Sequence, residues 1–451
     1  MGSFLSRFPV GSSSRSRVTW PQNPAQVVVQ RRGLPRDTEP ETISLRTLIE
    51  TRCSSVLTPF KAAWWLFNGH LQTGYAVVGD FSHADPVVYD RKLLRLKDGG
   101  TLGVDFTPPA AAGRAFDKTI PVVVALHGLT GGSHEAYVRN IIAPAVAPVE
   151  EGGLGYRAVV VNFRGCAGVP LTSPQLYGFS HTDDLRQAIL YIAQSYPHAP
   201  LLGLGFSLGA NILTRYVAEE GESCRLVSAC TLACPWDTLK TGKGLEDDWF
   251  TRRVYSKSLG TNLKNLVNRH VDSIRQFPDS RFAQALPALM SHSRLTVLQF
   301  DSLVSVHSGG SSPPFPFEDV WAYYKYSSSH DKLDAIRIPF LALNSDDDPI
   351  SQCAPQDYDQ NEWFTLVVTR GGGHMGWFQS GGAANRWARQ PALEWFRATG
   401  EGIRLEPRKV KSIEWRDGWL MEVGNDDLGC QETGDGETIV AKQGGDLLAG
   451  L

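Results

Sequence analysis

The chain has 451 residues, of which 42% are hydrophobic and 20% are charged. This length is enough for one large α/β domain with additions, or for two modest domains. The formal net charge of −3 gives no basic excess, which argues against a nucleic-acid partner. The seven cysteines are an odd number without paired C-x-x-C spacing, so we expect reduced thiols in an intracellular compartment.

The N-terminal segment, residues 1–42, is rich in Ser, Arg and Pro, and this composition predicts disorder. Its first residues, Met-Gly-Ser-Phe-Leu-Ser, match the motif for N-myristoylation at Gly2. Arg7, Arg15 and Arg17 follow without an acidic residue among them, a bias that is also typical of transit peptides. We favour a disordered segment without a targeting signal over either of these interpretations.

No stretch reaches the roughly 18 uninterrupted apolar residues that a membrane span needs. The closest is residues 62–67, which contain Trp64, Trp65 and Phe67. We favour ordinary core packing for these three aromatic side chains, and contact with a lipid surface is the alternative. The protein is expected to be intracellular, either cytoplasmic or peripherally associated with a membrane or lipid surface.

Strand patterns become regular after residue 86. A hairpin is expected from residues 89–96 and 102–106. Further strands are expected at residues 121–126, 157–162, 201–204 and 225–233. The helices between them are expected near residues 134–146, 183–196 and 210–216. Because the strands are continuous Val, Leu and Ala runs, they indicate a parallel sheet that is covered on both faces. The sequence therefore predicts an α/β fold with a mostly parallel central sheet.

This alternation stops at Trp236 and returns after Asp334, with strands at residues 340–343 and 364–368 and a last helix near 384–398. We expect one α/β domain over residues 43–423, with a helical cap insertion at about 236–334, followed by an acidic disordered tail at 424–451. The candidates for an apolar channel in the cap are Trp249, Phe250, Leu286, Leu289, Phe300, Trp321 and Tyr323. For any single one of them, packing of the cap against the sheet is the favoured role.

Residues 205–209 read Gly-Phe-Ser-Leu-Gly, between a predicted strand and a predicted helix. This spacing is typical of a nucleophile elbow, in which a sharp turn exposes the serine and small residues let the strand and helix pass closely. We expect Ser207 to be the nucleophile, above a helix N-terminus that stabilises negative charge. A glycine-rich turn with an incidental serine is the alternative that the rest of the chain must exclude.

A serine hydroxyl needs a base, and the base needs an acid that holds it in the right tautomer. After the predicted strand at 340–343 come Asp346, Asp347 and Asp348, and after the next strand comes His374 on a glycine-rich loop. Both groups follow Ser207 in the chain order Ser, Asp, His. Asp348 has the better register for the acid, and Asp347 is the alternative.

The oxyanion that forms during attack needs two backbone N–H donors. We expect them at Leu208, directly after the nucleophile, and at Leu129, in the loop that follows the strand at 121–126. His127 lies in the same loop and is expected to form hydrogen bonds within it, not to act as the base. No His, Asp or Glu cluster has the spacing of metal ligands, so neither a metal nor a cofactor is expected.

Several separated motifs occur in a consistent order: Gly-His-Leu-Gln-Thr at 69–73, His-Gly-Leu-Thr-Gly-Gly at 127–132, Asn-Phe-Arg-Gly-Cys at 162–166, the elbow, and the Asp-Asp-Pro and Gly-His sequences at 347–349 and 373–374. With them the chain resembles the YheT-like branch of the α/β-hydrolases over about residues 60–400. The resemblance implies an α/β-hydrolase fold and an acyl-ester substrate, and it assigns Ser207, His374 and an aspartate at 347 or 348 to the catalytic triad. The long Gly/Ser/Pro-rich segment at 305–316 departs from that pattern.

The sequence therefore predicts a serine esterase or lipase that acts on medium-chain acyl esters or acylglycerols through an acyl-enzyme. If an alcohol takes the acyl group in place of water, the same residues would make an acyltransferase of the fatty acid ethyl ester synthase type. Two further alternatives remain, a non-catalytic binding protein with the same fold and a peptide hydrolase.

Overall fold

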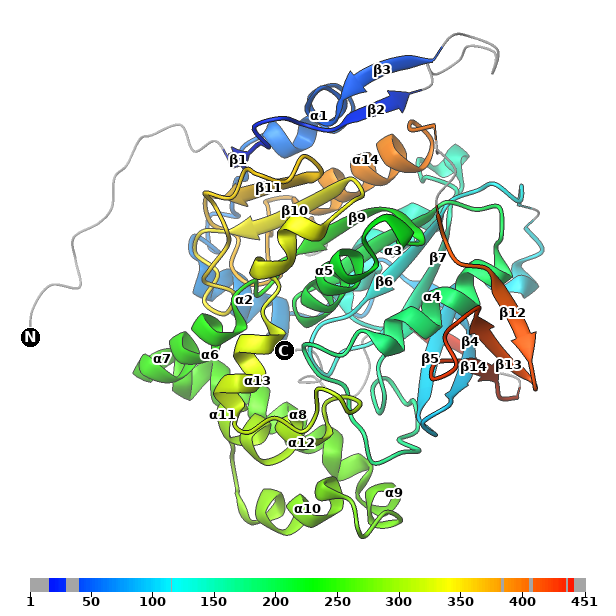
Figure 1. Ribbon diagram of the computed structural model, residues 1–451. Helices are drawn as coiled ribbons and strands as arrows, with labels where there is room; N and C mark the ends of the chain where they lie inside the picture. Colours follow the sequence, from blue (N-terminus) through cyan, green and yellow to red (C-terminus); the bar gives the residue numbers. More distant parts are fainter. Residues whose placement is uncertain are drawn as a thin grey trace, which may run out of the picture.

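A computed structural model describes residues 16–29, 40–114, 116–382, 385–404, 409–434 and 437–441. One large sheet runs through the molecule in the order β1-β11-β10-β9-β8-β6-β7-β5-β4-β14-β13-β12, and β15 also pairs with β4 (Figure 1). In chain order its strands are β1 (Arg17–Thr19), β4 (Val87–Leu96), β5 (Thr101–Thr107), β6 (Val122–Leu126), β7 (Arg157–Asn162), β8 (Leu201–Phe206), β9 (Leu226–Leu232), β10 (Phe340–Ser345), β11 (Phe364–Thr369), β12 (Ile413–Arg416), β13 (Trp419–Glu422), β14 (Cys430–Glu432) and β15 (Thr438–Ala441).

The core of this sheet is parallel, as the apolar runs predict. β7, β6, β8, β9, β10 and β11 are consecutive neighbours and pair in parallel, whereas the strands at both edges are antiparallel. Every residue of β6, β8, β9, β10 and β11 is buried. Strands that are covered on both faces have no need for polar positions, which is why alternation is absent.

Helices cover both faces of the sheet (Figure 1). Those that pack directly on it are α3 (Ala136–Val146), α4 (Asp183–Ser195), α5 (Leu208–Glu220) and α14 (Arg389–Gly400), and α1 (Leu45–Arg52) packs on α14. In β6, Val122, Val124 and Leu126 belong to the apolar cluster that contains α4 and α5, and Val123 and Ala125 to the cluster that contains α1, α3 and α14. The alternate residues of one strand therefore supply two separate cores.

The segment between β9 and β10 is helical, as expected for residues 236–334. It contains α6 (Thr238–Asp247), α7 (Trp249–Thr251), α8 (Lys257–Arg269), α9 (Val271–Arg275), α10 (Arg281–Ser291), α11 (Val297–Phe300), α12 (Val306–Ser308) and α13 (Val320–Ser327). Figure 1 shows these green and yellow helices together, to one side of the sheet. One further helix, α2 (Gly69–Val78), comes before β4.

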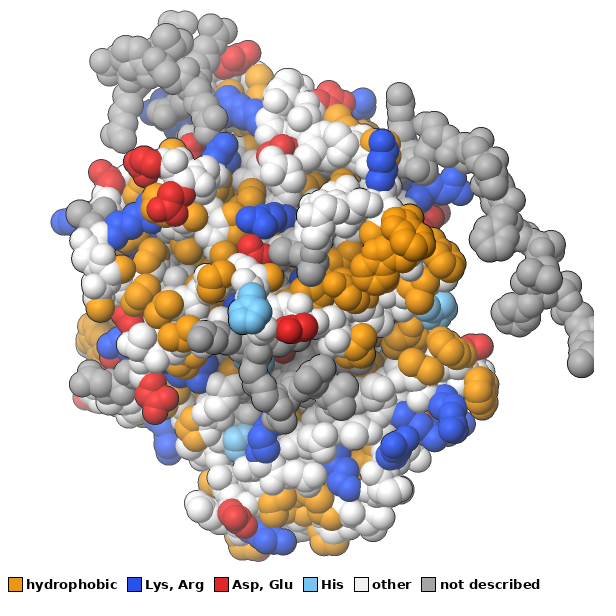
Figure 2. All heavy atoms as spheres, turned by 180° about the vertical axis from the view of Figure 1, so that it is seen from behind, with side chains coloured by type: hydrophobic (Ala, Val, Ile, Leu, Met, Phe, Trp, Pro, Cys, Tyr) orange, Lys and Arg blue, Asp and Glu red, His pale blue; other side chains and the backbone are white. Residues whose placement is uncertain are grey.

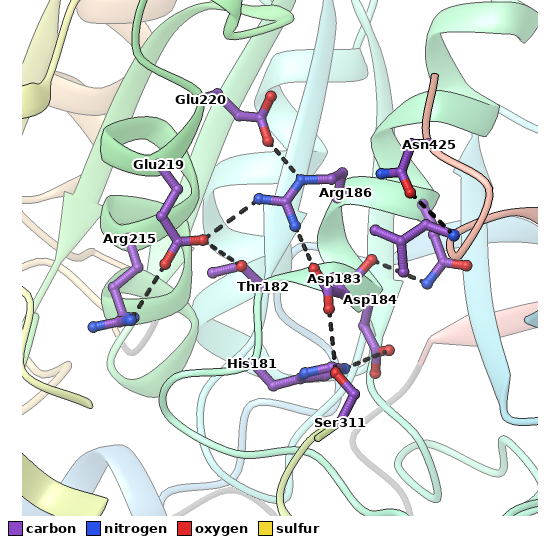
Figure 3. A network of polar contacts seen from close by, with 12 residues as sticks. His181, Thr182, Asp183, Asp184, Arg186, Arg215, Glu219, Glu220, Ser311 and Asn425 are labelled. Carbon is purple, nitrogen blue, oxygen red and sulfur yellow. Dashed lines mark hydrogen bonds and ion pairs between the residues drawn. The ribbon is translucent and has the colours of Figure 1, made fainter. Parts of the chain in front are cut away.

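A polar network joins the Gly/Ser/Pro-rich segment after α12 to the core (Figure 3). Ser311 Oγ donates to Asp183 Oδ2 across 3.3 Å, at the N-terminus of α4. Arg186 binds Asp183, and its Nε donates to Glu220 Oε1 of α5 across 2.6 Å. Since an acidic residue also stabilises a helix N-terminus, the same carboxylate fixes α4 and this segment.

Both ends of the chain differ from the expectation of disorder. β1 pairs with β11, β2 (Gln26–Val29) pairs with β3 (Glu41–Ser44), and β14 and β15 pair with β4. The prediction of disorder is therefore wrong for these residues. Composition averages over a whole segment, whereas a short strand needs only a few apolar side chains and an edge strand with free hydrogen-bonding groups. Gly2, Arg7 and Arg15 lie outside the described residues.

Candidate active site

Ser207 occupies a strained turn between β8 and α5. Its φ of 50° and ψ of −116° lie in a region that residues with a side chain rarely adopt. A Cβ at Gly205 would lie 2.7 Å from Ala210 Cα, and one at Gly209 would lie 2.5 Å from the His127 carbonyl oxygen. Only glycine fits at these two positions, so the motif has the steric basis that the sequence predicts.

The structure brings together three predicted side chains from the carboxyl ends of neighbouring strands. His374 Nε2 lies 2.8 Å from Ser207 Oγ, and His374 Nδ1 lies 2.8 Å from Asp348 Oδ2. A carboxylate only accepts hydrogen bonds, so Nδ1 carries the proton and Nε2 is left to accept from the serine hydroxyl. This is the arrangement that general-base activation of a serine requires.

Asp348 is held in place by the turn that follows it. Its Oδ1 accepts the backbone N–H groups of Ile350 and Ser351, each across 2.8 Å, which leaves Oδ2 directed at the imidazole. Ser351 Oγ also lies 3.4 Å from His374 Nδ1 and donates to the Ala233 carbonyl. Three hydrogen bonds thus fix both oxygens of this buried carboxylate.

Asp347, the alternative acid, has a different position. Its Oδ1 accepts from the backbone N–H of Gly373 across 2.9 Å and from Ser345 Oγ across 3.0 Å. Burial raises the pKa of its carboxyl above the usual value. Asp347 therefore supports the backbone of the histidine loop, and Asp348 contacts the ring itself.

Helix α2 holds the histidine loop, and this role was not predicted. Thr73 Oγ1 accepts the backbone N–H of His374 across 2.8 Å, and Gln72 Oε1 accepts that of Phe378 across 2.8 Å. A Cβ at Gly69 would lie 2.0 Å from the Asp347 carbonyl oxygen, and one at Gly373 would lie 2.4 Å from the Gly69 carbonyl oxygen, so α2 approaches the backbone of both the aspartate turn and the histidine loop. The sequence signal for this role is that Gly69, Gln72 and Thr73 fall on one face of α2, and the structure shows that this face is buried.

The loop that contains Leu129 is fixed by two buried tyrosines, which the sequence also did not reveal. The backbone N–H of Gly128 donates to Tyr137 Oη, and that of Thr130 donates to Tyr177 Oη, each across 2.9 Å. Leu129 lies between these two points and lines one cavity together with Leu208, Ser207 and His374. Both predicted oxyanion donors therefore belong to residues beside the nucleophile.

His127 is structural, as we expected. Its Nε2 accepts the backbone N–H of Phe163 across 3.2 Å, so Nδ1 carries the proton and donates to the Gly128 carbonyl across 2.7 Å. Burial lowers the pKa of this imidazole to about 3. The ring is therefore a neutral spacer between the loop and the sheet.

An apolar cavity opens at Ser207. Its walls come mainly from the segment between β9 and β10 and include Leu245, Leu259, Val297 and Tyr324. None of the seven channel candidates lines this cavity, and four of them are buried, as the packing role that we favoured for each one predicts. Leu286, Leu289, Phe300 and Tyr323 are buried without lining it, Trp321 is exposed, and Trp249 and Phe250 line a neighbouring cleft.

Within the described residues, no group of three or more His, Cys, Asp or Glu side chains could hold a metal ion. All seven cysteines are free, and six of them are buried.

Comparison with known proteins identifies the family. The family described as "alpha/beta hydrolase fold" matches residues 121–380, which include Ser207, Asp348 and His374. The chain belongs to this family. The predicted fold class is thereby confirmed, with the refinement that the parallel strands form the core of a mixed sheet.

Relatives of this α/β hydrolase have names from lipid chemistry. The monoacylglycerol lipase of Saccharomyces cerevisiae is 29% identical over 415 residues, which cover 83% of this chain and 88% of the lipase. The medium-chain fatty acid ethyl ester synthase/esterase 2 of the same yeast is 29% identical, with 75% of this chain and 85% of that protein covered. Phospholipase ABHD3 of Homo sapiens is 30% identical, with 74% and 78% covered. The resemblance drawn from the motifs is therefore confirmed.

Proposed function

We propose that this protein is a serine-dependent carboxylic ester hydrolase whose triad is Ser207, His374 and Asp348. The observation that carries the proposal is the unbroken chain of hydrogen bonds from Asp348 through His374 to Ser207, at the mouth of an apolar cavity. The names of the relatives, which are a lipase, an ester synthase/esterase and a phospholipase, support the same class of reaction.

The geometry supports a two-step mechanism. His374 Nε2 removes the proton from Ser207 Oγ, which attacks the acyl carbonyl carbon and forms a tetrahedral oxyanion. The backbone N–H groups of Leu129 and Leu208 stabilise that oxyanion. When the intermediate collapses, His374 passes its proton to the leaving alkoxide, and an acyl-enzyme with an ester bond to Ser207 remains.

Water completes the reaction. His374 then accepts a proton from a water molecule, whose oxygen attacks the acyl carbonyl, and returns it to Ser207 as the free acid leaves. Asp348 holds the neutral imidazole in the Nδ1–H tautomer and stabilises the imidazolium that forms in each step.

We propose a medium-chain acyl ester or an acylglycerol as the substrate, with its acyl chain in the apolar cavity. Burying each methylene of such a chain contributes about 0.8 kcal/mol, so a cavity with aliphatic walls favours long acyl groups over acetyl. The segment at about 236–334 would then act as a cap, because α6, α8, α11 and α13 supply cavity walls. We also propose that the protein works at a lipid surface. Within the described residues, no helix is long and apolar enough to cross a membrane.

Hydrolysis in water that contains ¹⁸O tests this function. The enzyme is incubated with a monoacylglycerol, and the released acid is analysed by mass spectrometry. One ¹⁸O atom per acid molecule is expected in a single turnover, because water resolves the acyl-enzyme. Addition of ethanol measures the competing acyl transfer as ethyl ester. Failure to release any acid from acylglycerols and simple esters would overturn the proposal.

A further inference from the structure

A group of large apolar side chains is exposed on one face of the molecule. From residues 64–78 it contains Trp64, Trp65, Phe67, Leu71 and Val78, and from α7 and the π-helix that follows it (Arg252–Ser256) it contains Trp249, Phe250 and Val254. We call these eight side chains the docking surface. Trp64 is 83% exposed, Phe67 65% and Trp249 72%. Core packing, the role that we favoured for the first aromatic cluster, is therefore wrong for its outer rings.

Packed side chains lie beneath the exposed rings of residues 64–67. Between the exposed residues, Ala63 and Leu66 are buried in a small apolar cluster with Phe81 and Phe378. Trp65 packs edge-on against Tyr75, with ring centroids 4.8 Å apart. On the opposite face of α2, buried polar residues bind the histidine loop. One face of this helix thus holds the catalytic loop while the other carries part of the docking surface.

The two halves of the docking surface are continuous. His70 of α2 lies against Phe250, with ring centroids 5.1 Å apart, and its Nδ1 lies 2.8 Å from Tyr255 Oη. Figure 2 shows hydrophobic side chains gathered over this face, with lysine and arginine side chains nearby. A cleft lined by His70, Trp249, Phe250 and Asp348 opens between the halves. Two of the eight side chains therefore line a cleft that also reaches the acid of the triad.

The chemistry of these side chains fits a lipid interface. Exposed apolar patches rimmed by polar groups mark binding surfaces, and tryptophan favours the boundary between lipid headgroups and acyl chains. Exposed cations belong to both segments: Lys61 comes three residues before Trp64, and the Arg253 guanidinium lies 5.9 Å from the centre of the Trp249 ring. Such cations match the phosphates of a bilayer surface. The carboxylates of Asp247 and Asp248 would be repelled by these phosphates. Both residues line the cleft.

We propose that the docking surface inserts into the interfacial region of a phospholipid bilayer and brings the opening beside Asp348 to lipid esters. The inference rests on the proposed function for the identity of the substrate, but the insertion itself needs no hydrolysis. Because aromatic rings outnumber cations on this surface, insertion depends mainly on the rings and persists on vesicles of phosphatidylcholine alone.

Vesicle binding by catalytically inert protein tests the proposal. The Ser207→Ala protein, which leaves the lipid intact, is sedimented with phosphatidylcholine vesicles, with and without phosphatidylserine. Trp64→Gln with Phe67→Gln in that background should lower the partition coefficient at least tenfold on both kinds of vesicle. Trp415→Gln with Val423→Gln, two exposed apolar residues in β12 and directly after β13, is the matched control and should bind as the parent does.

The outcomes separate the possibilities. Melting temperatures establish that all variants are folded, and Trp249→Gln, tested alone, gives a second reading from the other half of the surface. Equal binding by both double variants, or no binding by the parent, overturns the proposal. Self-association that the Trp64 and Phe67 changes abolish, without vesicle binding, would assign the surface to a second copy of the chain and also overturns it. Hydrolysis of soluble esters by the unmodified protein is measured separately, so failure of the proposed function is recognised by itself.

Discussion

Replacing Asp348 by asparagine separates the two candidate acids. In the native protein, Asp348 Oδ1 accepts two backbone N–H groups and Oδ2 accepts the imidazole N–H. Asparagine has one oxygen and one NH₂ group. If its oxygen keeps the two backbone donors, its NH₂ group faces His374 Nδ1, which must then accept a hydrogen bond. The ring proton moves to Nε2, and the nitrogen beside Ser207 can no longer act as a base.

The expected loss in kcat is a factor of about 10⁴, which corresponds to about 5 kcal/mol of transition-state stabilisation. Asp347→Asn is the matched control, since Asp347 Oδ1 accepts only from Gly373 and Ser345, and an amide oxygen can keep both bonds. We expect less than about a tenfold loss there. The assay is hydrolysis of a soluble p-nitrophenyl ester, with melting temperatures for both variants. A crippled Asp347→Asn enzyme beside a mildly impaired Asp348→Asn enzyme would refute this reasoning.

Three other predictions concern the surroundings of the triad. Tyr137→Phe and Tyr177→Phe each remove the acceptor of one loop N–H, so kcat should fall about ten- to a hundredfold with little change in KM, and each variant should lose about 1–3 kcal/mol of stability in urea unfolding. Leu259→Ala enlarges the cavity and should shift the chain-length preference towards longer acyl chains by about fourfold per added methylene. The preference is measured as kcat/KM over a series of acyl chain lengths. Leu286 is buried outside the cavity, so Leu286→Ala should leave the preference unchanged. Burial raises the pKa of Glu135 to about 8, from 4.5 in the unfolded chain. Between these pH values the folded protein keeps a proton that the unfolded chain has released, so the free energy of unfolding falls as the pH rises. In Glu135→Gln the unfolding free energy should therefore decline less from pH 5 to pH 8 than in the native protein, by a few kcal/mol, and parallel curves would show that Glu135 does not titrate in this window.

The parts that sequence predicts well are those set by local rules. The parallel core follows from continuous apolar runs, and the turn at Ser207 follows from glycines whose Cβ atoms would collide with the neighbouring backbone. The chain order of serine, aspartate and histidine predicts that the three side chains follow β8, β10 and β11. The choice between Asp347 and Asp348 needed the structure, because both follow the same strand and only the turn at Ile350 and Ser351 decides which carboxylate reaches the ring.

The contacts that sequence does not reveal join residues far apart in the chain. Thr73 binds the backbone of His374, 301 positions away, and nothing local marks a threonine hydroxyl for that contact. Tyr177 Oη accepts the backbone N–H of Thr130, which lies 47 positions earlier in the chain. Core packing was predicted for Trp64 and Phe67, but both rings are exposed. Apolar content alone does not distinguish a cluster in the core from an apolar patch on the surface.

Labelling with a fluorophosphonate tests the central claim most directly, because this probe reacts with a serine only when a base activates it. The labelled protein is digested and the modified residue is located by mass spectrometry, with Ser207→Ala and Ser351→Ala proteins beside it. Modification of Ser207 alone is expected, with complete loss of labelling and ester turnover in Ser207→Ala at an unchanged melting temperature, and with labelling retained in Ser351→Ala. Modification at another serine, or turnover by Ser207→Ala close to that of the native protein, would contradict the account.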